Sequence, residues 1–236
     1  MYAILPDEPM QRLVLFDIDG TLLMGNQQGK SALMQAVAPA PFNREHRISG
    51  KTDLQFIFEC LEPHYGEHEL TRRLPDLFDC YIAYLRESYI TDNRVRLLPG
   101  VRDLLNALES HRSVCLIGLL TGNIQRGAQI KLGAVGLSDY FTLGAFGEDG
   151  RYRRQLPPVA VDRALRHCGV HFRNRDVIIL GDTTNDIDCG RPLNARTIAV
   201  ASGFDSHADL AAEKPDFLFH DFQDTDAVLR AILDPL

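Results

Sequence analysis

Three short runs of apolar residues stand out along the chain because none of them has the spacing of an amphipathic helix. They occupy residues 13–16, 114–120 and 177–180. A continuous apolar run of this length is typical of a strand that is buried on both faces of a parallel sheet. Weaker runs at 197–200 and 217–219 favour edge strands, and residues 141–143 favour a further short strand.

Amphipathic helical patterns separate these strands. In the segment 101–110, one face carries Val101, Leu104, Leu105 and Leu108. Helical patterns also cover 124–132, 160–168 and 225–233. Strands that alternate with helices predict right-handed crossovers and a doubly wound parallel sheet. The expected fold class is therefore α/β with a Rossmann-like core.

The stretch between the first two strands has a different pattern, because no alternating strand signal occurs in it. Helical spacing covers 30–38, 52–58 and 70–87. Pro75 lies inside the last of these segments, where it either starts a helix or kinks one.

We therefore predict two domains. Residues 1–23 and 97–236 form the Rossmann-like core, and residues 24–96 form a small all-helical domain inserted after the first strand. Gly25 and Gly100 lie near the two crossings between them and suit a hinged opening and closing motion.

The composition is that of an ordinary globular protein, with 45% hydrophobic and 24% charged residues among 236. A formal net charge of −7 argues against non-specific binding to nucleic acid or to an anionic membrane. The five cysteines form no CxxC pair, which favours reduced thiols and gives no zinc site. The sequence shows neither a signal peptide nor an apolar run long enough to span a membrane. We expect a cytoplasmic protein, a monomer or small homo-oligomer, with neither nucleic acid nor membrane as a partner.

Polar residues follow the three strongest predicted strands. They are Asp17 and Asp19 after the first, Thr121, Gly122 and Asn123 after the second, and Asp182 and Asp186 after the third. Because the carboxyl ends of parallel strands share one edge of the sheet, we expect these residues to converge. The combination suits phosphoryl transfer.

Each residue type has a place in that chemistry. A carboxylate such as Asp17 can attack phosphorus and divide hydrolysis into formation and breakdown of an acyl phosphate. Two carboxylates repel each other, so we expect a bridging Mg²⁺, which prefers oxygen ligands. The Thr121 hydroxyl and the backbone N–H groups of Gly122 and Asn123, at a helix N-terminus, suit phosphate oxygens. A nearby cation is needed to offset the charge on the transferring group.

These residues resemble the motifs of haloacid dehalogenase superfamily phosphatases, of the kind typified by phosphoglycolate phosphatase. Residues 17–21 (DIDGT) are similar to the first motif, 119–123 (LLTGN) to the second and 181–186 (GDTTND) to the fourth. The resemblance covers nearly the whole chain, including a helical cap domain after the first strand. It implies that Asp17 is the nucleophile and that Asp19 protonates the leaving group and then activates water. It also implies that Asp17, the Asp19 backbone carbonyl and Asp182 hold Mg²⁺, with Asp186 supporting the metal shell.

The third motif departs from the family pattern, which has a lysine ahead of the helix that precedes the fourth motif. This sequence has Arg151, Arg153 and Arg154 there, followed by Leu156 and Pro157. A guanidinium is always charged and pairs well with phosphate and carboxylate, so an arginine can take the lysine's place. We favour Arg153, with Arg154 and Arg151 as alternatives.

The segment 49–53 (SGKTD) resembles the loop that phosphoglycolate-type relatives lower onto the substrate. Gly50 and Lys51 are therefore candidates for substrate binding. A capped helix with an exposed Lys51 is an equally good interpretation. Arg44, His46 and Arg47 lie close by in sequence and add positive charge.

The resulting expectation is a Mg²⁺-dependent phosphatase for a small phosphorylated metabolite, such as phosphoglycolate or a sugar phosphate. Dehalogenases of this superfamily lack the second acid, because a halide leaves without a proton, so Asp19 favours a phosphate ester. One alternative is a phosphosugar mutase of the same superfamily. Another is a non-catalytic phosphometabolite-binding protein, against which the presence of Asp19 argues, because binding alone needs no acid/base.

Overall fold

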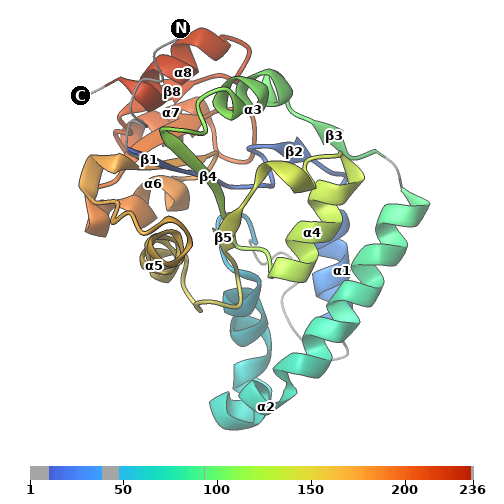
Figure 1. The fold of residues 1–236 in the computed structure, drawn as a ribbon. Coiled ribbons are helices and arrows are strands. Elements are labelled where there is room, and N and C mark those ends of the chain that lie inside the picture. Colours follow the sequence, from blue (N-terminus) through green and yellow to red (C-terminus); the bar gives the residue numbers. More distant parts are fainter. Residues whose placement is uncertain (1–10, 39–47, 93, 235–236) are drawn as a thin grey trace, which may run out of the picture.

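The computed structural model describes residues 11–38, 48–92 and 94–234. Within these residues, one parallel sheet has the strand order β5-β4-β1-β6-β7-β8 (Figure 1). Its strands are β1 (Arg12–Phe16), β4 (Cys115–Leu120), β5 (Leu143–Ala145), β6 (Val177–Gly181), β7 (Arg196–Val200) and β8 (Phe217–Phe219). The predicted doubly wound α/β fold is confirmed, with the first strand in the interior of the sheet.

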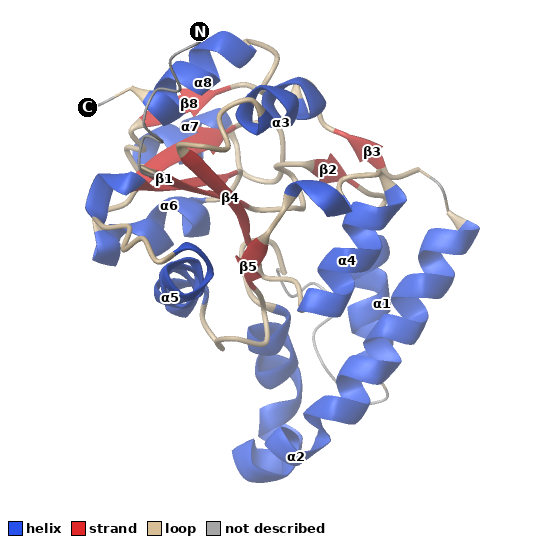
Figure 2. Cartoon of the chain, viewed as in Figure 1, coloured by secondary structure: helices blue, strands red, loops and turns tan. Residues whose placement is uncertain are grey.

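Helices cover both faces of this sheet because successive residues of a strand point to opposite sides (Figure 2). On one face, Val14 and Phe16 pack with α3 (Val101–Glu109), α4 (Gln125–Ala134) and α8 (Thr225–Leu233). On the other face, Leu13 and Leu15 pack with α5 (Leu156–Cys168) and α6 (Thr184–Gly190), and α7 (His207–Ala212) lies beside β8. Short 3-10 turns are η1 (Ser138–Tyr140), η2 (Arg153–Gln155), η3 (Asn174–Asp176) and η4 (Arg191–Leu193).

Some elements differ from the prediction in position, and two helices were not predicted. β7 is not an edge strand, because it pairs with β6 on one side and β8 on the other. β5 begins two residues later than expected. α5 begins at Leu156 rather than residue 160, with a proline in its first turn where no N–H donor is needed. α6 and α7 were not predicted, because seven and six residues are too few to show a helical period.

The chain leaves the sheet through β2 (Leu23–Met24) and returns through β3 (Arg96–Leu97). These two strands pair with each other in antiparallel fashion. Strands of two residues are too short to be predicted from sequence. Between them lie α1 (Gln28–Val37) and α2 (Asp53–Thr91), which Figure 1 shows projecting from the sheet as a separate arm. We call α1 and α2 the helical arm.

The helical arm has its own hydrophobic cluster, to which Leu33, Phe56, Ile57, Tyr81 and Leu85 belong. The spacing predicted two separate helical segments, 52–58 and 70–87, and α2 consists of two helices that meet at a kink, each longer than predicted. The break in its helical dihedral angles falls at Gly66, with φ 71° and ψ 159°, and not at Pro75. A side chain at residue 66 would be strained by that φ, whereas glycine adopts it readily. Among the described residues, no helix combines the length and apolarity needed to cross a membrane.

Candidate active site

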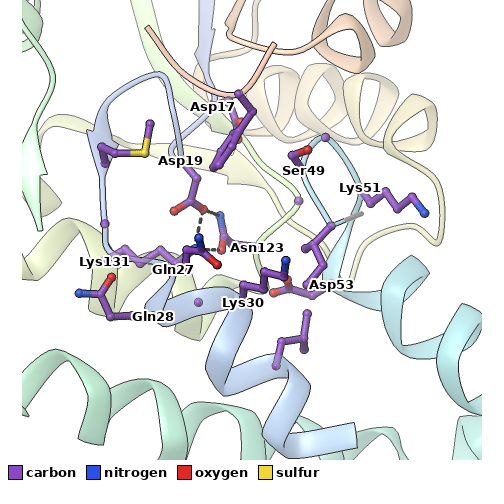
Figure 3. Close-up of a pocket in the computed structure, with 18 of the residues that line it drawn as sticks. Asp17, Asp19, Gln27, Gln28, Lys30, Ser49, Lys51, Asp53, Asn123 and Lys131 are labelled. Atoms are coloured by element: carbon purple, nitrogen blue, oxygen red, sulfur yellow. Dashed lines mark hydrogen bonds and ion pairs between the residues drawn. The ribbon is translucent and has the colours of Figure 1, made fainter. Parts of the chain in front are cut away.

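The predicted residues do meet at the carboxyl edge of the sheet. β1 lies between β4 and β6, with Phe16 paired to Leu119 and to Leu180. Asp17, Thr121 and Asp182 directly follow these strands, so neighbouring strands deliver them to the same edge. At this edge, Asp17, Asp19 and Asn123 line a cavity of about 650 Å³ that extends to the helical arm (Figure 3).

Asp17, Asp182 and Asp186 form a compact group of buried carboxylates. One oxygen from each lies within 4.8 Å of the others. Asp182 is held by Thr21 Oγ1, which donates to Oδ1 at 3.1 Å, and by Phe204 N, which donates to Oδ2 at 2.7 Å. Gly20 has φ 87°, which a larger residue would adopt only with strain, and a Cβ there would lie 2.2 Å from Asp182 Oδ2. Both the backbone conformation and the close contact therefore require glycine.

Asp186 sits in the first turn of α6. Its Oδ2 accepts hydrogen bonds from Thr183 Oγ1 at 2.6 Å and from Thr183 N at 3.0 Å, which closes a capping box. This pair explains why the chain turns into a helix immediately after β6. The capping box thereby aims the Asp186 carboxylate back towards the sheet edge.

Burial and mutual repulsion raise the free energy of ionising carboxylates in this group. Burial, followed by the charges of Asp186 and Asp17, raises the pKa of Asp182 well above its ordinary value. Burial raises the pKa of Asp186 to about 6, although Arg153 opposes the rise. When ionised, three carboxylates beside one guanidinium leave two excess negative charges. An all-oxygen site with that charge fits a hard divalent cation such as Mg²⁺.

Arg153 is the arginine that reaches this group. Its Nη2 lies 3.2 Å from Asp17 Oδ1, contacts Asp186 Oδ1, and donates to Leu120 O at 3.0 Å. Burial alone would lower the pKa of Arg153, but the charges of Asp17 and Asp186 outweigh burial and raise it. The guanidinium, only 5% exposed, is therefore a fixed positive charge beside Asp17.

The other two arginines point elsewhere. Arg151 forms an ion pair with Glu62 of the helical arm, and its guanidinium lies 4.4 Å from the ring centre of Phe58. The Arg154 guanidinium lies 5.4 Å from the ring centre of Tyr152. Neither contact brings these side chains to the three buried carboxylates.

The Asp19 side chain belongs to a different group from Asp17. Its Oδ2 accepts hydrogen bonds from Asn123 Nδ2 at 2.8 Å and from Lys131 Nζ at 2.5 Å. Lys131 Nζ also donates to Asn123 Oδ1 at 2.6 Å, so the three side chains form a closed ring of hydrogen bonds (Figure 3). Burial alone would lower the pKa of Lys131, but Asp19, Tyr89 and Asp53 together outweigh burial and raise the pKa.

Lys131 is a site residue that the sequence analysis missed. It lies on α4, seven residues after Ile124 and three after Ala128, on the buried side of that helix. Its position on the apolar face of a predicted helix could have identified it, because lysine is rarely buried without a partner.

Thr121, Gly122 and Asn123 form the loop between β4 and α4. Thr121 Oγ1 accepts from Asn123 Nδ2 at 2.8 Å, so the Asn123 side chain is engaged by its neighbours Thr121, Asp19 and Lys131. A Cβ at Gly122 would lie 2.0 Å from Lys51 O. Glycine at 122 therefore permits the close approach of the 49–53 loop.

The predicted substrate-binding pair Gly50 and Lys51 lines the cavity. Gly50 O accepts a hydrogen bond from Asn185 Nδ2 at 2.9 Å. Lys51 Nζ lies 2.6 Å from Glu59 Oε2 on α2, and Figure 3 shows its side chain directed away from the labelled acids. Arg44, His46 and Arg47 fall outside the described residues.

Asp53 ties the helical arm to the core. Its N donates to Gly122 O at 2.7 Å, and its Oδ2 accepts from Ile124 N at 2.9 Å. Burial raises the pKa of Asp53 to about 7, against the opposing charge of Lys131. The first residue of α2 thereby fixes the loop that carries Gly122 and Asn123.

Comparison with known proteins identifies the family. The model of the haloacid dehalogenase-like hydrolases matches residues 14–200. The chain belongs to this family. The resemblance drawn from the motifs is thus confirmed, and the matched segment includes every candidate site residue named above.

Curated relatives of this hydrolase include two enzyme types. A phosphoglycolate phosphatase from Synechococcus elongatus is 31% identical over 87% of this chain and 91% of its own length. A pyrophosphatase, PpaX, from Oceanobacillus iheyensis is 26% identical over 90% of this chain and 94% of its own length.

Solved structures agree in fold. A hydrolase from Pseudomonas syringae has a TM-score of 0.69 at 20% identity, covering 94% of this chain and 99% of that chain. A β-phosphoglucomutase from Clostridium difficile also has a TM-score of 0.69, at 17% identity, covering 94% and 97%. At these identities the likeness concerns the fold alone.

Proposed function

We propose that this hydrolase is a Mg²⁺-dependent phosphatase that acts on a small phosphorylated metabolite through an aspartyl phosphate on Asp17. The observation that carries the proposal is the contact of Arg153 with Asp17 and Asp186 inside the group of three buried carboxylates. Relatives named as a phosphoglycolate phosphatase and a pyrophosphatase support a small phosphate compound as substrate.

In the first step, an Asp17 carboxylate oxygen attacks phosphorus while the bond from phosphorus to the leaving-group oxygen breaks. Arg153 orients Asp17 and offsets negative charge on the transferring group, the kind of fixed electrostatic stabilisation that works best away from water. The N–H groups of Asn123 and Ile124 already donate to Thr121 Oγ1 and Asp53 Oδ2, so we propose the Gly122 N–H as the backbone donor to phosphate oxygens.

Asp19 supplies the proton that the leaving-group oxygen needs. In the second step the Asp19 carboxylate takes a proton from water, and the water oxygen attacks phosphorus, which frees inorganic phosphate and the Asp17 carboxylate. Asn123 and Lys131 both donate to Asp19 Oδ2. This leaves Oδ1 as the oxygen for proton transfer.

Mg²⁺ would be held by Asp17 and Asp182, with the Asp19 backbone carbonyl as a further ligand and Asp186 beside them. When bound, the ion neutralises charge on the phosphoryl group and lets anions share the site. Gly50 and Lys51, in the loop that touches Gly122, are proposed to contact the substrate when the helical arm, as the cap domain of residues 24–96, closes on the core.

The test is phosphate release from p-nitrophenyl phosphate and a metabolite panel, with Mg²⁺ and with EDTA. Wild type is compared with Asp17→Asn, which keeps the shape of the side chain but removes the nucleophilic charge. We expect Mg²⁺-dependent release that falls by at least about a thousandfold in Asp17→Asn, as for other nucleophile removals.

The matched control is Asp188→Asn, an exposed aspartate on the same helix as Asp186. It should keep wild-type turnover. No release from any ester by Mg²⁺-loaded wild type would contradict the proposal. Isomerisation of a hexose 1-phosphate without net phosphate release would then favour a mutase.

A further inference from the structure

Beyond the reacting phosphate, the cavity contains a second positively charged region. It is formed by Lys131 of α4 and Lys30 of α1, both of which line the cavity. Figure 3 shows Lys30 extending from the first turn of α1 towards the other labelled side chains. Neither lysine belongs to a sequence motif described above.

The position of Lys131 indicates that this positively charged region lies on the leaving-group side of the reacting phosphate. Its ammonium lies 2.5 Å from Asp19 Oδ2, and the group that protonates a leaving-group oxygen must lie within hydrogen-bond reach of that oxygen. Arg153 lies instead among the carboxylates around Asp17. The two cations are therefore divided between the transferring phosphoryl group and the leaving group.

Lys30 is an uncompensated charge. Within the described part of the chain it makes no ion pair or hydrogen bond, whereas Lys51 is paired with Glu59. Lys30 also lies in the first turn of α1, where the positive end of the helix dipole adds to its charge. A lysine turned into a cavity without a partner is available to an anion.

The backbone makes room for this region. A Cβ at Gly29 would lie 2.9 Å from Lys131 Nζ, so any larger residue there would crowd the ammonium. The other carboxylate at this end, Asp53, has a pKa of about 7 because of burial and is only partly charged at neutral pH. Positive charge from Lys30 and Lys131 therefore exceeds the negative charge of Asp19 and Asp53.

We propose that Lys30 and Lys131 bind a second negatively charged group carried by the leaving group of the substrate. The preferred substrate is thus a phosphate compound whose leaving group bears a carboxylate or a further phosphoryl group close to the scissile bond. This inference rests on the proposed phosphatase function, and it makes both lysines specificity-determining residues.

The test compares kcat/KM for ethyl phosphate, phosphoglycolate and pyrophosphate with Mg²⁺-loaded protein. Ethyl phosphate has a methyl group where phosphoglycolate has a carboxylate. Wild type should prefer phosphoglycolate or pyrophosphate over ethyl phosphate by about tenfold or more, the value of a charged hydrogen bond. Whichever is preferred identifies the anionic group as carboxylate or phosphoryl.

Lys30→Met should lose at least about ten times more kcat/KM with the preferred anionic substrate than with ethyl phosphate, chiefly through KM. Lys30→Arg should restore the preference, and Lys214→Met, on the surface, should leave it unchanged. An equal loss for both substrates in Lys30→Met, or no preference in wild type, would overturn the proposal.

Binding to Asp17→Asn separates this inference from the proposed function. If Mg²⁺-loaded wild type releases phosphate from none of these three compounds and from no ester of the panel, the phosphatase proposal fails. The dissociation constants of phosphoglycolate, pyrophosphate and ethyl phosphate for Asp17→Asn, with and without Lys30→Met, still decide the inference. Tighter binding of an anionic compound that Lys30→Met abolishes supports it, and equal binding of all three overturns it.

Discussion

At the scale of single residues, two positive charges with different surroundings define the site. Arg153 is buried among carboxylates at the sheet edge, and Lys131 is buried against Asp19 and Asn123. Each cation compensates acids that would otherwise be costly to bury. In the proposed function, Arg153 therefore serves the phosphoryl group and Lys131 the leaving group.

Arg153→Ala should lower kcat by about a hundredfold or more, because it removes the fixed positive charge beside Asp17. Arg151→Ala should change kcat by less than about threefold, since Arg151 pairs with Glu62 and stacks on Phe58. Steady-state kinetics with p-nitrophenyl phosphate measures both, and circular dichroism verifies that each variant is folded. Equal losses would show that Arg153 is not the motif-three cation.

At the scale of elements, the start of α2 holds the arm against the core. Thr52 Oγ1 donates to Arg151 O at 2.6 Å and accepts from Gln55 N at 3.0 Å, which caps the helix. Asp53 adds two bonds to the loop that begins α4. The arm and the loop of Gly122 and Asn123 are therefore joined at one helix N-terminus.

This junction predicts a pH dependence of stability. The pKa of Asp53 is about 7 in the folded protein and 3.8 in a model peptide, so the folded state binds more protons between these values. Its contribution to the free energy of unfolding therefore falls as pH rises through that window and is constant above it. Asp53→Asn removes the contribution. Urea unfolding measures the free energy of unfolding at pH 5 and pH 8. The value for Asp53→Asn minus the value for wild type should be about 1–3 kcal/mol larger at pH 8 than at pH 5.

Asp76→Asn, on the exposed surface of the same helix, serves as the control and should unfold like wild type at both pH values. A difference between Asp53→Asn and wild type that does not change with pH would show that Asp53 is ionised throughout.

At the scale of the whole molecule, the carboxylate group joins segments that are far apart in the chain. Asp17 follows β1, whereas Asp182, which follows β6, and Asp186, in the first turn of α6, lie about 165–170 residues later. A ligand that binds all three stabilises the folded core as a unit, because the unfolded chain does not hold them together.

Mg²⁺ should therefore raise the melting temperature. At about 100 times its dissociation constant, a bound ion adds about 2.7 kcal/mol, which corresponds to roughly 5–10 °C for a chain of this size. Asp182→Asn should abolish most of the shift, and Asp188→Asn should keep it. Differential scanning fluorimetry with Mg²⁺ and with EDTA measures the effect. An unchanged shift in Asp182→Asn would place the ion elsewhere.

Much of this site could be predicted because strand ends are visible in sequence. Asp17, Thr121 and Asp182 each follow a continuous apolar run, and parallel strands bring such positions to one edge. Arg153 followed from chemistry, since the buried carboxylates need a nearby cation. Lys131 escaped notice because its long side chain reaches back two turns of α4 to Asp19, a contact that no local pattern encodes.

The sequence by itself determined the parallel sheet, the helices α1 and α2 between β2 and β3, and the order of the motifs, because these follow from local apolar periodicity. Only the tertiary structure decided the break at Gly66, the β2–β3 pair and the interior place of β7. It also decided which arginine meets Asp17 and which lysines line the cavity. These features depend on long side chains and on contacts between distant segments, and their geometry is fixed only when the elements pack.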